Sequence, residues 1–253
     1  MTKVANAAEA RAQSQVYAFL AQAFADPDGT TLTRIRQALP ATEAALTTIG
    51  GTDSRAALLA LHREFDDLQD DDLLAAHHRV FGYGVSGDCP PYEGEYGHAH
   101  IFQKAQGLAD NAGFIEAFGL APAPGFADRL DHIAVELEFL HVLAAKEAYA
   151  LAHDHGEEPL AILRAAMRNY FEHHLGRWAP AFTARLQSKA QDGPYAALAR
   201  LLAAFIAEEA RALDVTPAMA NIAPFDPQTD DETADCSGCA AGTVFNPEMR
   251  GES

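Results

Sequence analysis

The chain has 253 residues, 49% of them hydrophobic, and a formal net charge of −18 at neutral pH. This composition predicts a chain with a buried core and argues against disorder over its whole length. The acidic excess argues against a non-specific grip on nucleic acid or anionic lipid, because both require basic surfaces. Basic peptides, other proteins and cationic ligands are left as the natural partners.

The sequence gives no sign of a membrane or an oxidising compartment. It has no run of about 18 apolar residues, so no membrane-spanning helix is expected. Its first residues lack a basic start followed by an apolar stretch and do not predict a secretory signal. The three cysteines, Cys89, Cys236 and Cys239, are too few and too unevenly placed for a disulfide framework. We therefore expect a cytoplasmic protein.

Apolar residues recur at helical spacing in almost every long segment, and alanine, the best helix former, is abundant. No convincing pair of alternating strands and no internal repeat accompanies them. The pattern predicts an all-α fold. In chain order the periodic residues are Val16, Leu20 and Phe24; Leu58, Leu61, Phe65 and Leu68; Ile101, Ala105, Leu108, Ala112 and Ile115; Ile133, Leu137, Leu140 and Ala144; Leu163, Met167 and Tyr170; and Leu198, Leu201 and Phe205.

Glycine and proline predict where these helices break. Breaks are expected at Pro40, at Gly50-Gly51 and through residues 119–125. Gly193-Pro194 is expected to open the last strong helix, which should end near Leu213.

Residues 82–97 form an unusual loop for a helical protein, rich in glycine and containing two prolines and three tyrosines. Glycine gives the backbone freedom and Pro90-Pro91 stiffens it. The loop therefore either presents aromatic and acidic side chains or serves as a structural connector.

The last part of the chain differs in character. Residues 221–253 contain seven acidic residues, one basic residue and few large apolar residues. This composition is typical of a flexible, disordered segment. We expect a helical domain at residues 1–220 and an acidic tail at residues 221–253.

Two patterns are compatible with a metal site. Cys236-Ser237-Gly238-Cys239 in the tail offers half a zinc site or a redox dithiol, but no second such pair follows. Glu95-Tyr96-Gly97-His98 and Glu138-Phe139-Leu140-His141 match the Glu-x-x-His pattern of di-metal helical bundles. The first lies beside glycines at a loop end, and the second is also compatible with the polar face of a helix. A helical di-metal carboxylate enzyme therefore remains the alternative interpretation.

The remaining histidines occur mainly as close pairs. Adjacent histidines on a helix point to different faces and rarely chelate one ion, so we expect exposed helix surface. No phosphate-binding glycine loop or nucleophile elbow is present. Neither a catalytic residue nor a cofactor is therefore expected. The pairs are His77-His78, His98 with His100, His153 with His155, and His173-His174.

Asp131-His132 precede a strongly apolar helix. An acid near a helix N-terminus is favoured by the helix dipole, which is one explanation for Asp131. Together with residues 89–96, the pair could also form an acidic, aromatic-lined patch. Such a patch suits a basic peptide with an apolar core, because charge steers binding and aromatic rings anchor it.

Four blocks of sequence stand out: His77 to Phe81, Asp88 to Gly97, Leu108 to Phe114 followed by Ala117 to Leu120, and Asp131 to Leu140. These blocks resemble the TorD/DmsD/NarJ-like maturation chaperones of molybdenum-containing redox enzymes, and the resemblance spans about residues 16–213. The extended Cys-Pro-Pro-Tyr-Glu segment most resembles chaperones of DMSO-reductase-like enzymes acting on dimethylsulfide, ethylbenzene, selenate or chlorate.

The resemblance implies a single-domain, all-helical bundle of the TorD-like type and a non-catalytic role. Such proteins bind the apo catalytic subunit of a molybdoenzyme, and often its twin-arginine signal peptide. They assist insertion of the molybdenum cofactor and delay export until folding is complete. The implied partner-binding residues are Phe81, Pro91, Tyr92, Glu93, Tyr96, Asp131 and His132.

The sequence departs from the family motifs at several positions. His77 stands where the family has an aromatic residue, and Val80 stands where it has leucine. Asp128 replaces glutamate and Leu130 replaces proline. These departures weaken a detailed transfer of signal-peptide contacts but leave the order and spacing of the motifs intact.

Overall fold

A computed structural model describes residues 6–82, 88–97, 101–123 and 128–220, with only the backbone described at 101–103. The chain divides into two units, residues 1–223 and 224–253. The predicted acidic tail, including Cys236 and Cys239, lies outside the described residues.

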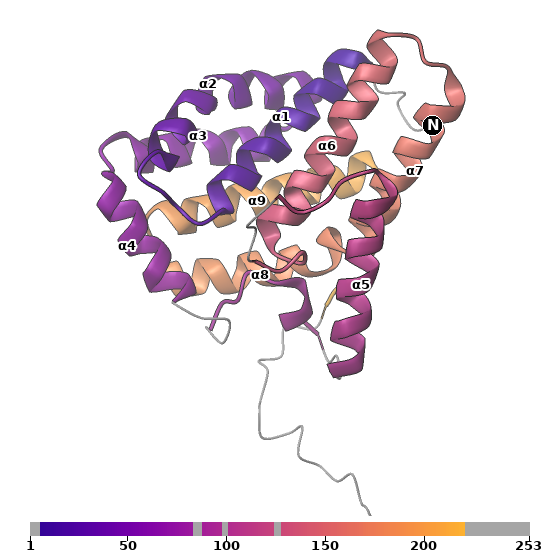
Figure 1. Cartoon of the computed structure of the whole chain (residues 1–253). Helices are drawn as coiled ribbons and strands as arrows, with labels where there is room; N and C mark the ends of the chain where they lie inside the picture. Colours follow the sequence, from indigo (N-terminus) through magenta and orange to yellow (C-terminus); the bar gives the residue numbers. More distant parts are fainter. Residues whose placement is uncertain (1–5, 83–87, 98–100, 124–127, 221–253) are drawn as a thin grey trace, which may run out of the picture. The chain divides into compact units, whose positions relative to one another are not determined.

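The described residues form nine α-helices and one short 3-10 helix and contain no named strand, which confirms the all-α prediction (Figure 1). Within these ranges, no helix is both long and apolar enough to cross a membrane. The elements are α1 (Ala7–Phe24), α2 (Thr31–Ile49), α3 (Thr52–Asp66), α4 (Asp70–Phe81), η1 (Glu93–Glu95), α5 (Ile101–Ala117), α6 (Ile133–Ala152), α7 (Glu157–His173), α8 (Leu175–Ala190) and α9 (Pro194–Ala212).

Most of the predicted helix limits agree with the structure, but one break is wrong. Pro40 lies inside α2, which continues to Ile49 and ends at Gly50 in the left-handed conformation, with φ at +79°. Proline removes one helical hydrogen bond and normally kinks or ends a helix. Here α2 buries Leu39 just before the proline and Leu46 after it, so packing holds both halves of the helix in place.

The helices pack in pairs around an aromatic core. Helix α1 lies between α2 and α6, α9 lies against α3 and α8, and α7 packs on α6 (Figure 1). Tyr17 of α1 meets Phe205 of α9 edge to face, with 4.9 Å between ring centroids. Trp178 and Phe182 of α8 are fully buried nearby in the same core cluster. The aromatic side chains of α8 thus form the surface on which the loop before α5 packs.

A tight connection between α7 and α8 sets the position of this aromatic surface. A single residue, His174, separates the two helices, and Gly176 lies in the first turn of α8. A Cβ atom at Gly176 would lie 2.7 Å from the carbonyl oxygen of Phe171. Glycine is therefore required for α8 to start this close to the end of α7.

Candidate partner-binding site

The loop around η1 is fastened to the start of α6 by backbone pairing. Tyr92 and His132 form an isolated antiparallel bridge. The amide of Glu93 donates to the carbonyl oxygen of Asp131 at 2.9 Å. The amide of Ile133 donates to the carbonyl oxygen of Pro91 at 2.8 Å. Two segments about 40 residues apart in sequence are thereby held in fixed register. We call this region, residues 91–95 with residues 128–133, the loop–helix junction.

A buried ion pair lies at the centre of the loop–helix junction. Asp131 is only 3% exposed, and Arg129 donates to both of its carboxylate oxygens, at 2.9 and 2.7 Å. The amide of Gly94 adds a third hydrogen bond at 3.0 Å. The same guanidinium reaches Glu95 at 2.9 Å, and Lys104 also donates to Glu95. The negative charge of Asp131 is therefore neutralised within the chain.

Beneath the junction lies a buried polar network that the sequence did not reveal. A carboxylate oxygen of Glu93 accepts from Nδ1 of His174 at 2.9 Å. Glu136 of α6 is fully buried and accepts from the indole N–H of Trp178 at 2.9 Å. Burial and the neighbouring Glu93 carboxylate raise the pKa of Glu136 well above its ordinary value. Burial therefore favours the neutral form of the Glu136 carboxyl.

The outer part of the junction consists of Tyr92, His132 and Asp128. The hydroxyl of Tyr92 donates to Asp128 at 3.0 Å, and its ring lies edge to face with that of His132 at 5.2 Å. The guanidinium of Arg129 lies over the same tyrosine ring at 4.6 Å. Burial and the hydrogen bond to Asp128 raise the pKa of Tyr92 to about 12. Tyr92 thus stays a neutral donor, and Asp128 remains exposed beside it.

His132 has a structural task as the N-cap of α6. Its Nδ1 accepts from the amide of Ala134 at 3.1 Å, so this ring nitrogen carries no proton. The ring is 6% exposed, and burial lowers the pKa of His132. The neutral form of the imidazole is therefore the one that this cap requires.

Helix α4 brings a second histidine to the same region. His77 is buried beside Phe81, with 4.9 Å between ring centroids, and its Nε2 lies 3.4 Å from the exposed Asp26. Burial lowers the pKa of His77, whereas Asp26 acts to raise it and His132 to lower it further. The carboxylate of Asp26 thus acts on groups from both α4 and the loop–helix junction.

The expectation that the paired histidines occupy exposed helix surface is wrong for His77 and His174, which are 8% and 2% exposed. It is confirmed for His173, which is exposed on α7, whereas His78 is half-buried and the exposed His153 and His155 lie beyond the end of α6. The buried rings pack on core aromatic residues, as His174 does on the fully buried Tyr170 at 4.7 Å, whereas His153 packs on Tyr149, which is itself exposed. His98 and His100 lie outside the described residues.

The structure places the seven predicted partner-binding residues in two sets. Phe81 and Tyr96 are buried at 6% each, and both rings contact Phe182 of α8. Tyr96 also donates to the carbonyl oxygen of Pro90 at 2.9 Å. The other five, Pro91, Tyr92, Glu93, Asp131 and His132, come together in the loop–helix junction.

The sequence patterns did not single out several residues of this region. Glu136 carried a usable signal, because it lies three residues after Ile133 on the apolar face of its helix. Arg129, His174 and Trp178 gave none, because their contacts join segments far apart in sequence.

The two Glu-x-x-His patterns are not brought together as a metal site in the described part of the chain. Glu95 pairs with Arg129 and Lys104, and Glu138 is exposed. His141 bonds Ser14 through Nδ1. Among the residues that the structure describes, no group of three or more metal-ligating side chains is present.

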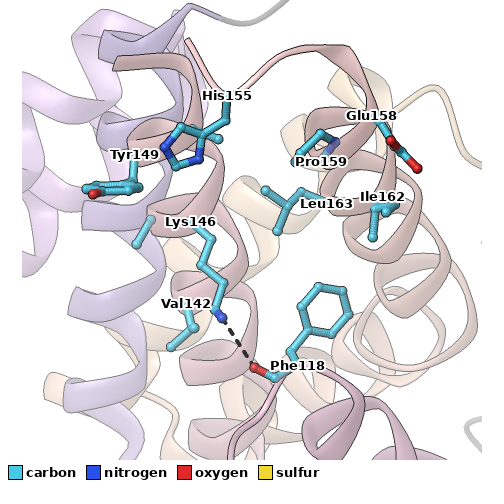
Figure 2. A pocket seen from close by; sticks show the side chains of 11 residues that line it. Phe118, Val142, Lys146, Tyr149, His155, Glu158, Pro159, Ile162 and Leu163 are labelled. Carbon is cyan, nitrogen blue, oxygen red and sulfur yellow. Dashed lines mark hydrogen bonds between the residues drawn. The ribbon is translucent and has the colours of Figure 1, made fainter. Parts of the chain in front are cut away.

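A separate apolar pocket of about 620 Å³ lies between the later part of α6 and the start of α7 (Figure 2). Tyr149 and Ile162, each 57% exposed, lie on its two flanks in Figure 2, and Phe118 lies at its lower end in that view. Exposed apolar surface of this kind is typical of contact with another polypeptide.

Comparison with known families identifies the class of protein. The family model described as nitrate reductase delta subunit matches residues 21–184, and the chain belongs to this family. The match covers α2 to α7 and most of α8, including the whole loop–helix junction. It confirms the predicted resemblance to redox enzyme maturation chaperones.

Individual relatives agree with the family match. The chain is 27% identical over 195 residues to a protein named chaperone protein TorD from Salmonella bongori, covering 68% of this chain and 82% of that one. A TorD chaperone of Vibrio cholerae is 32% identical over 100 residues, covering 40% of this chain and 44% of that one. The relatives are named chaperones, in agreement with the expectation of a protein that is not an enzyme.

Proposed function

We propose that this chain is a cytoplasmic chaperone for the apo catalytic subunit of a DMSO-reductase-family molybdoenzyme. It binds that subunit or its twin-arginine signal peptide, assists insertion of the molybdenum cofactor and delays export until the subunit has folded. Within that family, the proposed client belongs to the subgroup acting on dimethylsulfide, ethylbenzene, selenate or chlorate. The family match and the TorD relatives support the general role.

The observation that carries this proposal is the construction of the loop–helix junction. Backbone pairing and the Arg129–Asp131 ion pair hold the junction rigid, while Tyr92 and the exposed Asp128 lie at its outer side. Asp26 adds a second exposed carboxylate that acts on Tyr92 and His132. A preorganised aromatic ring beside two carboxylates favours a basic peptide, because little conformational entropy is lost when it binds.

Within this proposal the seven partner-binding residues have three different roles. Pro91 and Tyr92 contact the partner directly, and Glu93, Asp131 and His132 hold the contacting loop in position. Phe81 and Tyr96 support it from the core through Phe182 of α8. Asp128 and Asp26 supply the charge that a basic partner meets.

Co-purification with the catalytic subunit of a DMSO-reductase-family molybdoenzyme from the same organism tests the proposal. The Tyr92→Ala/Asp128→Asn double variant should capture at least tenfold less of that subunit, because it removes both the ring and the charge. A matched control is Leu59→Ala/Asp66→Asn, which alters an apolar and an acidic side chain exposed on α3. Equal capture by both variants, with both folded by circular dichroism, would overturn the site assignment.

A further inference from the structure

A second cavity, of about 420 Å³, lies where five helices meet, away from the loop–helix junction in sequence. Its buried wall includes Glu147, Met167 and Glu209, while Arg168 and Ala212 are exposed at its edge, so it opens to solvent. The lining residues are Glu9, Gln13, Ile49, Glu147, Arg164, Ala165, Met167, Arg168, Glu209, Ala212 and Leu213.

The two arginines of this cavity are already engaged by acceptors. Arg164 donates through Nε to Glu147 at 2.7 Å. Arg168 donates to the carbonyl oxygens of Leu213 and Asp214, at 2.8 and 2.6 Å, and so satisfies the end of α9. The Nη2 atom of Arg164 is different, because it is buried and has no hydrogen-bond partner. A buried donor of this kind is costly unless an acceptor reaches it.

Glu209 is, in contrast, a buried acceptor without a charged donor. The residue is 4% exposed, and its carboxyl accepts from the Gln13 amide at 2.5 Å and the Tyr17 hydroxyl at 2.9 Å, both of them neutral donors. Burial raises the pKa of Glu209 to about 7, and the neighbouring Glu208 carboxylate adds to this. Glu208 itself faces away, accepting from the backbone amides at Asp53 and Ser54.

Glu209 therefore has no cationic hydrogen-bond partner among the described residues, and Nη2 of Arg164 has no acceptor. The other ionisable groups of the lining are the half-buried Glu9, the exposed Arg168, and Glu147, which pairs with Arg164. Helices α2 and α9 both end at the cavity, where the negative ends of their dipoles favour a positive charge, and α1 begins beside it with Glu9 in its first turn, at the positive end of that dipole. Ile49, Met167 and Leu213 supply apolar wall.

We propose that this cavity binds a small amino acid with an apolar side chain. Its ammonium group pairs with Glu209, its carboxylate accepts from Nη2 of Arg164, and its side chain packs on Ile49, Met167 and Leu213. A ligand of zero net charge supplies both missing partners without disturbing the Glu147–Arg164 pair. This inference does not depend on the proposed chaperone function.

Calorimetric titration of the full chain at pH 8 tests the proposal with three probes of similar size. L-leucine carries both charged groups, 3-methylbutylamine lacks the carboxylate, and 4-methylpentanoate lacks the amine. Saturable binding of leucine is expected, with the amine about tenfold weaker and the acid not binding. Glu209→Gln should weaken leucine binding at least tenfold, and Arg164→Lys should bring leucine down to the level of the amine. Glu64→Gln, at an exposed site on α3, should leave the affinity for leucine unchanged.

Any of three binding results would overturn the proposal, as would the pH result given below: no saturable binding of leucine at millimolar concentration, binding of the acid as tight as that of leucine, or full affinity in Glu209→Gln. The unaltered chain provides a measurement that does not depend on how the variants fold. Because Glu209 must lose its proton to pair with the ammonium group, leucine affinity should rise about tenfold per pH unit below pH 7 and level off above it. An affinity independent of pH between 5 and 8 would likewise refute the site.

Discussion

The loop–helix junction and the cavity beside α9 differ in how they stabilise a buried carboxyl group. Each buries a carboxyl group, with Asp131 at 3% exposed and Glu209 at 4%. Asp131 receives two hydrogen bonds from Arg129, whereas Glu209 receives one each from Gln13 and Tyr17. A cationic partner keeps a buried carboxyl charged and fixes the local structure. Neutral donors leave it responsive to pH and to any cation that enters.

The two regions consequently respond to pH in opposite directions. The junction depends on a neutral His132, whose pKa is lowered by burial, so it weakens as the pH falls. In the absence of a cationic ligand, the folded cavity favours a protonated Glu209, so the contribution of this group to folding stability falls as the pH rises. Four predictions test this difference.

The largest effect is expected from Arg129→Leu, which leaves Asp131 buried without a cation. Breaking a buried pair costs about 3 to 5 kcal/mol, and partial exposure of Arg129 places this case near 3 to 4 kcal/mol. Urea denaturation measures the loss. Arg34→Leu, which breaks the exposed Arg34–Asp28 pair, is the control and should cost less than about 1 kcal/mol. Equal losses in the two variants would remove the distinction between the regions.

Glu209→Gln should change the pH dependence of stability by up to about 3 kcal/mol. The folded chain holds the proton of Glu209 to a pKa of about 7, whereas the unfolded chain releases it near 4.5. Stability from this group is thus complete below pH 4.5 and is lost as the pH rises to 7. Relative to the unaltered chain, Glu209→Gln should gain stability across that window, as thermal unfolding at several pH values would show. Parallel pH profiles would contradict the assignment.

His132 should produce a smaller effect at acidic pH. Its pKa is lowered in the folded chain, so the stability that it contributes is present above pH 6.5 and is lost as the pH falls below that value. His132→Asn keeps an N-cap acceptor and should remove this part of the acid sensitivity, while His132→Ala should cost about 1 kcal/mol at pH 8. His155→Asn, at an exposed site, serves as the control. Unfolding curves at pH 5 and 8 that match the control would refute the role of the cap.

Tyr92→Phe should have the smallest effect on stability, below about 1 kcal/mol, because the lost hydrogen bond to Asp128 lies at an exposed position. Urea denaturation measures this change. A loss as large as that of Arg129→Leu would mean that Tyr92 holds the junction together.

Much of the fold could be predicted from the sequence, because it depends on local spacing. The apolar repeats predicted the helices, and Gly193-Pro194 marked the start of α9, since proline suits a first helical turn. Pro40 shows the limit of this reasoning: the cost of a proline inside a helix is local, but the packing that compensates for it comes from other helices.

The candidate site was predicted only in part. Residues 91–93 and 131–132 were recognised as motifs, and motifs are visible in a linear sequence. The sequence alone determined an acidic, all-α chain and the positions of these motifs. Only the tertiary structure decided that Arg129 neutralises Asp131, that Phe81 and Tyr96 lie in the core, and that Glu209 is buried beside neutral donors. Burial and ion pairing depend on contacts between distant segments, and these contacts set charge states that side-chain identity leaves open.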